Sequence, residues 1–228
     1  RYPFPRGSVG TEKIKRKRLI KMATPNSVIR AIAKRYPDMA VLKSLLVLKP
    51  VNHILRAFSF ERTSYKGKYY LWKVIMPLYR QRPILALNYS VRIGTGDYLF
   101  DLGIQSLKEV VGEVISTIEN SESLKFLKEI NAPQDFLMLV NSMNIDFKNN
   151  RATLMDVACS HWLMGNTKEC ELILRESTNV PVVYKYENEL VKEINELLEE
   201  IEHSPSSVSN RLASWENRNK IHIFGTSA

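Results

Sequence analysis

Hydrophobic positions in the first sixty residues recur at helical spacing. Thr24-Pro25 has the residue types of an N-cap followed by a first helical position, and apolar residues then fall on one face up to Ala33. This pattern predicts a helix that ends before Pro37. It also predicts a second helix over residues 38–48, with Asp38 as its cap, and a short third helix over 51–58.

Between residues 58 and 101 the period changes to the two-residue alternation of β-strands. Segments 58–65, 68–78 and 84–93 are rich in aromatic and β-branched residues, and Lys66-Gly67 has the composition of a hairpin turn. A fourth short strand is predicted over 97–101. One face of this sheet is expected to bury a core through Trp72, Val74, Leu87 and Tyr89, on which helices would pack.

From residue 106 to the end the helical period returns. Apolar stripes run through residues 110–118, 136–140 and 190–201, and the last helical stretch follows a break at Ser204-Pro205. The sequence therefore predicts an α+β fold with N-terminal helices, a small antiparallel sheet of three or four strands and a C-terminal helical layer.

Residues 154–174 resemble a single helical hairpin of the tetratricopeptide type. The residues that carry the resemblance are Ala158, His161, Trp162 and Leu163 before a Gly165-Asn166 turn, and Glu169, Cys170 and Leu174 after it. No second copy occurs at the spacing of 34 residues that a repeat array requires. The segment is expected to be one antiparallel helix pair.

Charge is distributed unevenly along the 228 residues. Residues 1–103 contain 21 Lys and Arg against 5 Asp and Glu, a net charge of +16, whereas residues 104–228 contain 12 against 19, a net charge of −7. Such asymmetry suits either an anionic partner or an internal contact between the halves. We expect a basic arm at 1–22, a helix-and-sheet part at 23–103 and a helical half at 104–228, the last two docked as one body.

The basic arm is a candidate for binding nucleic acid or another anion. Its six candidate residues are Lys13, Lys15, Arg16, Lys17, Arg18 and Lys21. Such density can neutralise phosphates and release counterions, and exposed Tyr65, Tyr69 or Trp72 could add base stacking. The segment 4–8, Phe-Pro-Arg-Gly-Ser, resembles a thrombin cleavage remnant, which leaves open whether residues 1–11 are native.

A second candidate surface is the polar face of the predicted sheet. Lys73, Asn88, Ser90 and Arg92 would lie on it if the strands pair as the alternation suggests. This face could bind an anionic or protein partner, and the alternative is an ordinary solvent-exposed face.

Sequence motifs that would indicate catalysis, phosphate binding or metal binding are weak throughout the chain. Cys159 and His161 diverge on a helix, which disfavours a shared metal ion or a catalytic dyad, and no G-x-S-x-G motif occurs. Gly94-Thr95-Gly96 fits a turn between strands better than a phosphate loop, and Asp97 with Asp101 has the pattern of solvated strand ends. We expect no catalytic residues, no metal and no cofactor. Distant residues could still build an active site by converging at the bottom of a deep pocket.

The composition of the chain predicts its cellular compartment and whether it spans a membrane. Two cysteines in 228 residues are too few for a disulfide framework and suit a reducing compartment, so a cytoplasmic location is expected. No apolar run is long enough for a transmembrane segment.

Two segments together resemble a class of uncharacterised bacterial α+β domains, some of which look like immunity proteins. These are residues 54–62, which lead into the strands, and the hairpin of residues 158–169. The resemblance implies a binding protein without chemistry of its own, although a pI of about 9.5 departs from that of nuclease-neutralising immunity proteins. We therefore expect a non-enzymatic protein-interaction module, immunity-like or regulatory, and the alternative is a nucleic-acid-associated protein that uses its basic N-terminal half.

Overall fold

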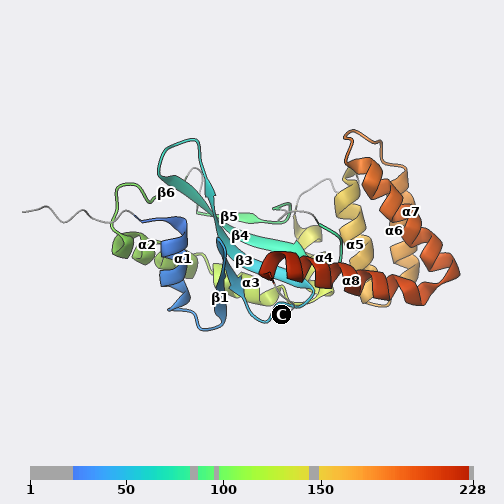
Figure 1. The fold of residues 1–228 in the computed structure, drawn as a ribbon, viewed down its shortest axis with the longest axis horizontal. Helices are drawn as coiled ribbons and strands as arrows, with labels where there is room; N and C mark the ends of the chain where they lie inside the picture. The colour runs from blue at the N-terminus through green and yellow to red at the C-terminus, as the bar shows by residue number, and fades with distance from the viewer. Residues whose placement is uncertain (1–22, 83–86, 95–97, 144–148, 226–228) are drawn as a thin grey trace, which may run out of the picture.

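The computed structural model describes residues 23–82, 87–94, 98–143 and 149–225 (Figure 1). These residues form an α+β fold with an antiparallel sheet and eight helices. The strands are β1 (Met39–Leu42), β2 (Leu45–Leu48), β3 (Ile54–Arg62), β4 (Lys68–Pro77), β5 (Val91–Ile93) and β6 (Phe100–Asp101). The helices are α1 (Pro25–Ala33), α2 (Leu107–Asn120), α3 (Ser123–Glu129), α4 (Pro133–Ser142), α5 (Arg151–Leu163), α6 (Thr167–Thr178), α7 (Glu187–His203) and α8 (Pro205–Phe224). The predicted fold class is confirmed.

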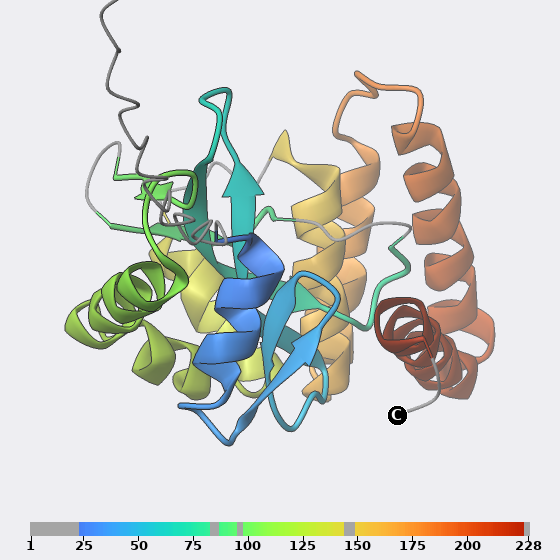
Figure 2. The ribbon, with the colours of Figure 1, turned by 60° about the vertical axis from the view of Figure 1, so that its left-hand side comes forward.

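The sheet has the strand order β1-β2-β3-β4-β5, and β6 also pairs with β4. Its centre is the long β3–β4 hairpin, in which Ile54 pairs with Pro77 and Arg62 pairs with Tyr69. Gly67 lies in the turn with a φ of +80°, a conformation that glycine adopts without steric cost. The hairpin projects beyond the neighbouring strands in Figure 2.

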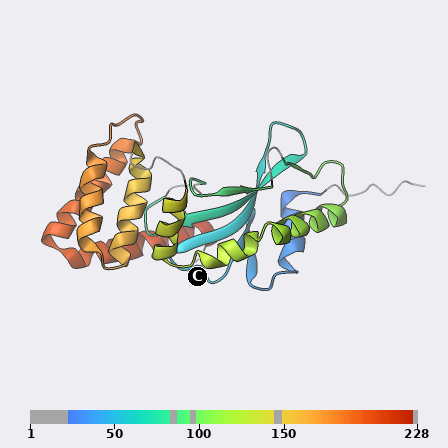
Figure 3. The same ribbon diagram turned by 180° about the vertical axis from the view of Figure 1, so that it is seen from behind.

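Both faces of the sheet are buried, but by different amounts. The first face carries Phe58, Leu71 and Ile75 into the main core, which residues from α1 to α8 also enter. Figure 3 shows α2, α3 and α4 along this face. The second face carries Leu55, Val74 and neighbouring apolar residues into a smaller core, to which Ile223 near the end of α8 contributes. The sheet therefore needs apolar side chains at successive positions, as in strands that are buried on both faces.

Residues 38–48 form the β1–β2 hairpin and not the predicted second helix. Leu45 to Leu48 are all buried, and Lys43 adopts a φ of 51° in the two-residue turn. A run of four apolar residues has no strand alternation when both sides of the strand are covered, so its period cannot separate a strand from a helix. The sheet consequently has six strands, more than the predicted three or four.

Residues 51–58 were also predicted as a helix, and the structure places most of them in β3. Ile54, Arg56 and Phe58 face the first side of the sheet, whereas Leu55 and Ala57 face the second. All five are buried, so the alternation is again hidden.

The segment 84–93 is a strand only at β5, from Val91 to Ile93; residues 83–86 lie outside the described part. Tyr89 precedes the strand in a turn and is buried in the main core, while Trp72 and Val74 lie on the second face. The predicted single apolar face of Trp72, Val74, Leu87 and Tyr89 is therefore wrong. Of the predicted strand 97–101, the structure has Phe100 and Asp101 as β6.

The helical predictions are confirmed where local capping signals are strong. Thr24 caps α1 and Ser106 caps α2 through reciprocal side-chain hydrogen bonds, and Pro133 opens α4. Helices α5 and α6 form the predicted hairpin, with Gly165 at a φ of +80° between them. The break at Ser204 separates α7 from α8. None of the helices in the described ranges has the length and apolarity needed to cross a membrane.

The β3–β4 turn provides a test of the fold. A Cβ added at Gly67 would come within 3.0 Å of the Gly103 Cα atom and would also force a positive φ on a non-glycine residue. We expect Gly67→Ala to lower the free energy of unfolding by about 1–3 kcal/mol. Gly112→Ala in α2, where nothing lies within 4 Å, should raise it by roughly 0.5–1 kcal/mol. Urea denaturation measures both, and equal effects of the two substitutions would contradict the described turn.

Candidate interaction surface

The structure separates the residues that the sequence suggested as binding sites. Lys13, Lys15, Arg16, Lys17, Arg18 and Lys21 all lie outside the described residues. Of the aromatic residues considered for base stacking, Tyr65 is 64% exposed at the hairpin tip, whereas Tyr69 packs edge-on against Phe60. One aromatic side chain on the hairpin is thus freely accessible.

The predicted polar face of Lys73, Asn88, Ser90 and Arg92 does not exist as one surface. In the β4–β5 register Trp72 pairs with Arg92 and Lys73 pairs with Val91, so Lys73 and Arg92 project to opposite faces. Asn88 is exposed in the turn before β5, and Ser90 is buried. The prediction failed because it placed Arg92 on the face of Lys73, whereas the register of β5 places Arg92 opposite Trp72.

Lys73 belongs to the helix-covered face. Its Nζ lies 4.3 Å from the centroid of the Phe126 ring of α3, and its side chain is half-buried. Burial lowers the pKa of Lys73. The residue stabilises the contact between α3 and β4 and has little access to a partner.

Arg92 instead belongs to a small cluster of aromatic and charged side chains on the second face. Its guanidinium carbon lies 3.6 Å from the centroid of the Tyr70 ring and 5.1 Å from that of Trp72. The Trp72 Nε1 atom donates a hydrogen bond of 2.8 Å to Glu61. We call Glu61, Tyr70, Trp72 and Arg92 the arginine patch.

The arginine patch lies further along the second face than the apolar part that packs with Ile223 of α8, and its Tyr70, Trp72 and Arg92 side chains are half-buried. At the β3 register positions Leu55 and Ala57, which pair with Met76 and Val74, the face is apolar and belongs to the core that includes Ile223. Further along the same strand, at Ser59 and Glu61, the side chains are partly or fully exposed. One face of the sheet thus changes from packed core to accessible surface.

Arg92 has no carboxylate partner within the described residues, and its buried Nε atom has no hydrogen-bond partner there. Stacking on Tyr70 holds the guanidinium plane, and such contacts contribute about 0.5–2 kcal/mol. An arginine that is held flat and left without an anion can bind a carboxylate through two parallel hydrogen bonds.

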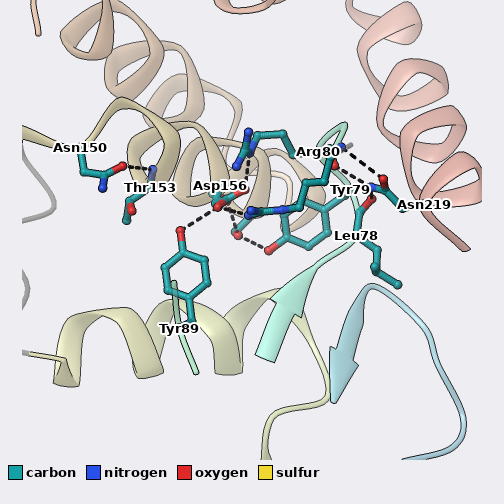
Figure 4. Close-up of polar contacts among 10 residues, drawn as sticks. Leu78, Tyr79, Arg80, Tyr89, Asn150, Thr153, Asp156 and Asn219 are labelled. Carbon is teal, nitrogen blue, oxygen red and sulfur yellow. Dashed lines mark hydrogen bonds and ion pairs between the residues drawn. The ribbon is translucent and has the colours of Figure 1, made fainter. Parts of the chain in front are cut away.

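A buried ionic cluster joins the sheet to the helical half (Figure 4). Asp156 of α5 is fully buried; its Oδ1 atom accepts a hydrogen bond of 2.7 Å from Arg80 Nε, and its Oδ2 atom accepts from Arg82 and, at 2.7 Å, from the Tyr89 hydroxyl. Burial alone would raise the pKa of Asp156, but the charges of the two arginines outweigh it and lower the pKa. The carboxylate is therefore ionised in the folded chain at neutral pH.

Neighbouring hydrogen bonds hold the segment after β4 from two sides. The Tyr79 hydroxyl lies 2.5 Å from Ser160 Oγ of α5. From α8, the buried Asn219 amide donates to the Leu78 and Arg80 carbonyl oxygens at 2.6 Å each and accepts from the Arg82 backbone N–H (Figure 4). Residues 78–82 are thus fixed by both α5 and α8.

This cluster brings together ionisable side chains from both halves, which is the arrangement that an active site built from distant residues would need. Asp156 is 0% exposed, and Arg80 and Arg82 are 7% exposed. Gln81, which lies between Arg80 and Arg82 in the sequence, lines a surface groove, but Asp156, Arg80 and Arg82 do not line it. Because a solute cannot reach the carboxylate, the cluster acts as a structural contact.

The two cysteine side chains are buried, whereas His161, considered with Cys159 for a metal site or a dyad, is half-buried. Cys159 is 1% exposed and Cys170 is 2% exposed, and both are free thiols. Burial raises the pKa of Cys159 well above its ordinary value and raises that of Cys170 to about 12, so both stay protonated. Within the described ranges no three His, Cys, Asp or Glu side chains come close enough to hold a metal ion.

Comparisons of this chain with family models, with curated proteins and with solved structures find no match. Its function must therefore be inferred from the chemistry of its own residues.

The ionic cluster makes a strong stability prediction. Asp156→Ala would leave two buried guanidinium groups without their carboxylate, and removal of one partner from a buried ion pair costs about 3–5 kcal/mol. Glu171→Ala, which removes an exposed i,i+4 pair with Arg175, should cost at most about 0.5 kcal/mol. Urea denaturation of both variants measures the difference. A cost for Asp156→Ala close to that of Glu171→Ala would contradict the proposed role of the cluster.

The lowered pKa of Asp156 predicts how this contribution depends on pH. The pKa of an unfolded aspartate is about 3.9, so the stabilisation is fully present above that value and is lost as pH falls through the lower pKa of the folded state. We expect the stability difference between the wild type and Asp156→Asn to be constant at neutral pH and to shrink below about pH 4. Denaturation curves over this range test it, and a difference independent of pH would be inconsistent with an ionised Asp156.

Proposed function

We propose that this protein is a binding module for another protein and that the arginine patch is its contact surface. The observation that carries the proposal is the arrangement of Arg92, which stacks on Tyr70 beside Trp72 and has no anionic partner among the described residues. Arginine, tryptophan and tyrosine are the residues that most often dominate the binding energy of protein interfaces. Both a regulatory role and an immunity-like role would fit such a module.

The neighbourhood of the patch supports this proposal. Glu61 orients the Trp72 ring through the Nε1 hydrogen bond, so the indole needs no reordering when a partner binds. The apolar half of the same face is packed beneath α8, which makes a rigid support for the accessible half. We infer a partner that offers a carboxylate to Arg92 and an apolar group to the edge of Trp72.

A nucleic-acid partner is the second candidate, because residues 1–103 carry a net charge of +16. Binding of this kind would be dominated by phosphate contacts and would weaken steeply with salt. The exposed Tyr65 ring, with the Lys68 ammonium 6.0 Å from its centroid, could stack on a base.

The proposal is tested by purifying the partner that the full chain retains from a native lysate and by measuring its affinity for variants. We expect Arg92→Ala to weaken binding about 30-fold, which corresponds to a hot-spot loss of about 2 kcal/mol. Arg175→Ala, at an exposed arginine of α6, is the matched control and should change the affinity less than about twofold. Circular dichroism verifies that both variants are folded.

Two outcomes would overturn the proposal. Equal affinities of the wild type and Arg92→Ala for the retained protein would remove the arginine patch as the contact. Retention of generic DNA or RNA with micromolar, steeply salt-dependent affinity, unaffected by Arg92→Ala, would favour the second candidate.

A further inference from the structure

The short strand β5 forms one border of the sheet. It is the last strand in the order β1-β2-β3-β4-β5 and pairs with β4 alone. Figure 3 shows it along this border, next to β4. A border strand presents backbone donors and acceptors that another strand can bind, so we asked which groups of β5 face outward.

The hydrogen bonds of β4 determine the direction of each backbone group. At one end of the β3–β4 ladder, the Thr63 N–H donates to the Lys68 carbonyl oxygen. At the other end, the Leu78 N–H donates to the His53 carbonyl oxygen. Because bonded and non-bonded pairs alternate along an antiparallel ladder, the even-numbered residues of β4 bond to β3. The odd-numbered residues therefore bond to the opposite side, where β5 lies.

Arg92 is the residue of β5 whose backbone faces away from β4. Val91 and Ile93 lie opposite odd-numbered residues of β4, so their N–H and carbonyl groups bond to β4. Arg92 lies opposite Trp72, which is even-numbered, so its N–H and carbonyl groups point to the outer side. Neither group has a hydrogen-bond partner among the described residues.

The side chain of the same residue lacks an anion. The Arg92 guanidinium stacks 3.6 Å from the centroid of the Tyr70 ring, and its buried Nε atom has no partner in the described part of the chain. A charged side chain on a border strand hinders pairing with a strand that offers it no counter-charge. Arg92 therefore discriminates between strands by whether they bring a carboxylate.

We propose that the partner adds to β5 as an antiparallel strand, with a glutamate opposite Arg92. This inference rests on the proposed function, because it states how a partner engages the arginine patch. The glutamate would exchange two backbone hydrogen bonds with Arg92, and its side chain would project to the same face as the guanidinium. Main-chain bonds of this kind supply affinity, and the alternate side chains supply specificity.

The position of the guanidinium favours glutamate over aspartate. Arg92 leans back over Tyr70 of β4, so the carboxylate has to reach across β5 from the added strand. The residues on either side of the glutamate would project to the opposite face of the sheet, next to Val91 and Ile93, where apolar side chains fit. The expected partner segment is thus extended and alternates apolar, acidic and apolar residues.

The probe is a blocked peptide of sequence Thr-Thr-Val-Glu-Val-Thr-Thr, titrated into the full chain and followed by NMR. We expect a Kd in about the millimolar range or tighter and at least about tenfold slower hydrogen exchange of the Arg92 amide on binding. The same peptide with glutamine in place of glutamate should bind about tenfold more weakly. Methylation of the glutamate nitrogen should abolish binding, because it removes the backbone donor.

Two further measurements separate side chain from backbone. Arg92→Ala keeps the outward backbone groups, so it should remove most of the preference for glutamate over glutamine, whereas Arg175→Ala should retain it. In the free wild type, the Arg92 amide should exchange at least about tenfold faster than the Ile93 amide, which bonds to β4.

The complex with the retained protein distinguishes this inference from the proposed function. Protection of the Arg92 amide in that complex would support strand addition. A partner that needs the Arg92 side chain but leaves the Arg92 amide as exposed to exchange as in the free chain would overturn strand addition and leave the proposed function standing. No binding of the glutamate peptide, or equal affinities of the glutamate and glutamine peptides, would also overturn it.

Discussion

Asp156 is the side chain on which the contact between sheet and helical half depends. Its carboxylate ties Arg80 and Arg82, which follow the central strand β4, to the middle of α5. Ion pairs removed from water gain strength when their remaining donors and acceptors are satisfied. Tyr89 supplies an additional hydrogen bond to the carboxylate, while the buried Arg82 Nε atom has no partner within the described residues. Because residues 78–82 are also held by Asn219, the same short segment positions α5 and α8.

This contact determines which part of the second face of the sheet α8 packs against. α8 is anchored through Asn219, and Glu216 one turn earlier pairs with His53 at 2.7 Å and with Lys220 at 2.7 Å. Ile223, one turn beyond Asn219, then packs on the apolar half of the face. The rest of this face carries the arginine patch, which is only half-buried, so the packing of one helix separates the fully buried part of the face from the partly accessible part.

Elements whose boundaries depend on local chemistry are predictable from the sequence. The cap at Thr24, the proline at 205 and the glycine at 165 each act within one turn. Residues 38–58 were predicted wrongly, because strands covered on both faces lose the alternation that identifies them. Charge asymmetry between the halves suggested a contact between them, but not which residues make it.

The ionic cluster was missed because Asp156 lies more than 60 residues from Arg80, Arg82 and Tyr89 in the chain. One signal could have indicated it: Asp156 is the single charged residue among Leu154, Met155, Val157 and Ala158, and a lone carboxylate in an apolar helix needs a cationic partner. The arginine patch was partly indicated, because Arg92 was a candidate for the polar face and Trp72 was a candidate for base stacking, but the two were predicted on different faces of the sheet.

Native-state hydrogen exchange tests most directly whether the cluster unites sheet and helical half. If Asp156 couples them, the slowest amides of β3 and β4 and those of α5 will open with the same free energy in the wild type. In Asp156→Asn, α5 and α6 will then lose protection at lower denaturant than the sheet. Independent opening of α5 and α6 in the wild type, with no change on substitution, would contradict the account.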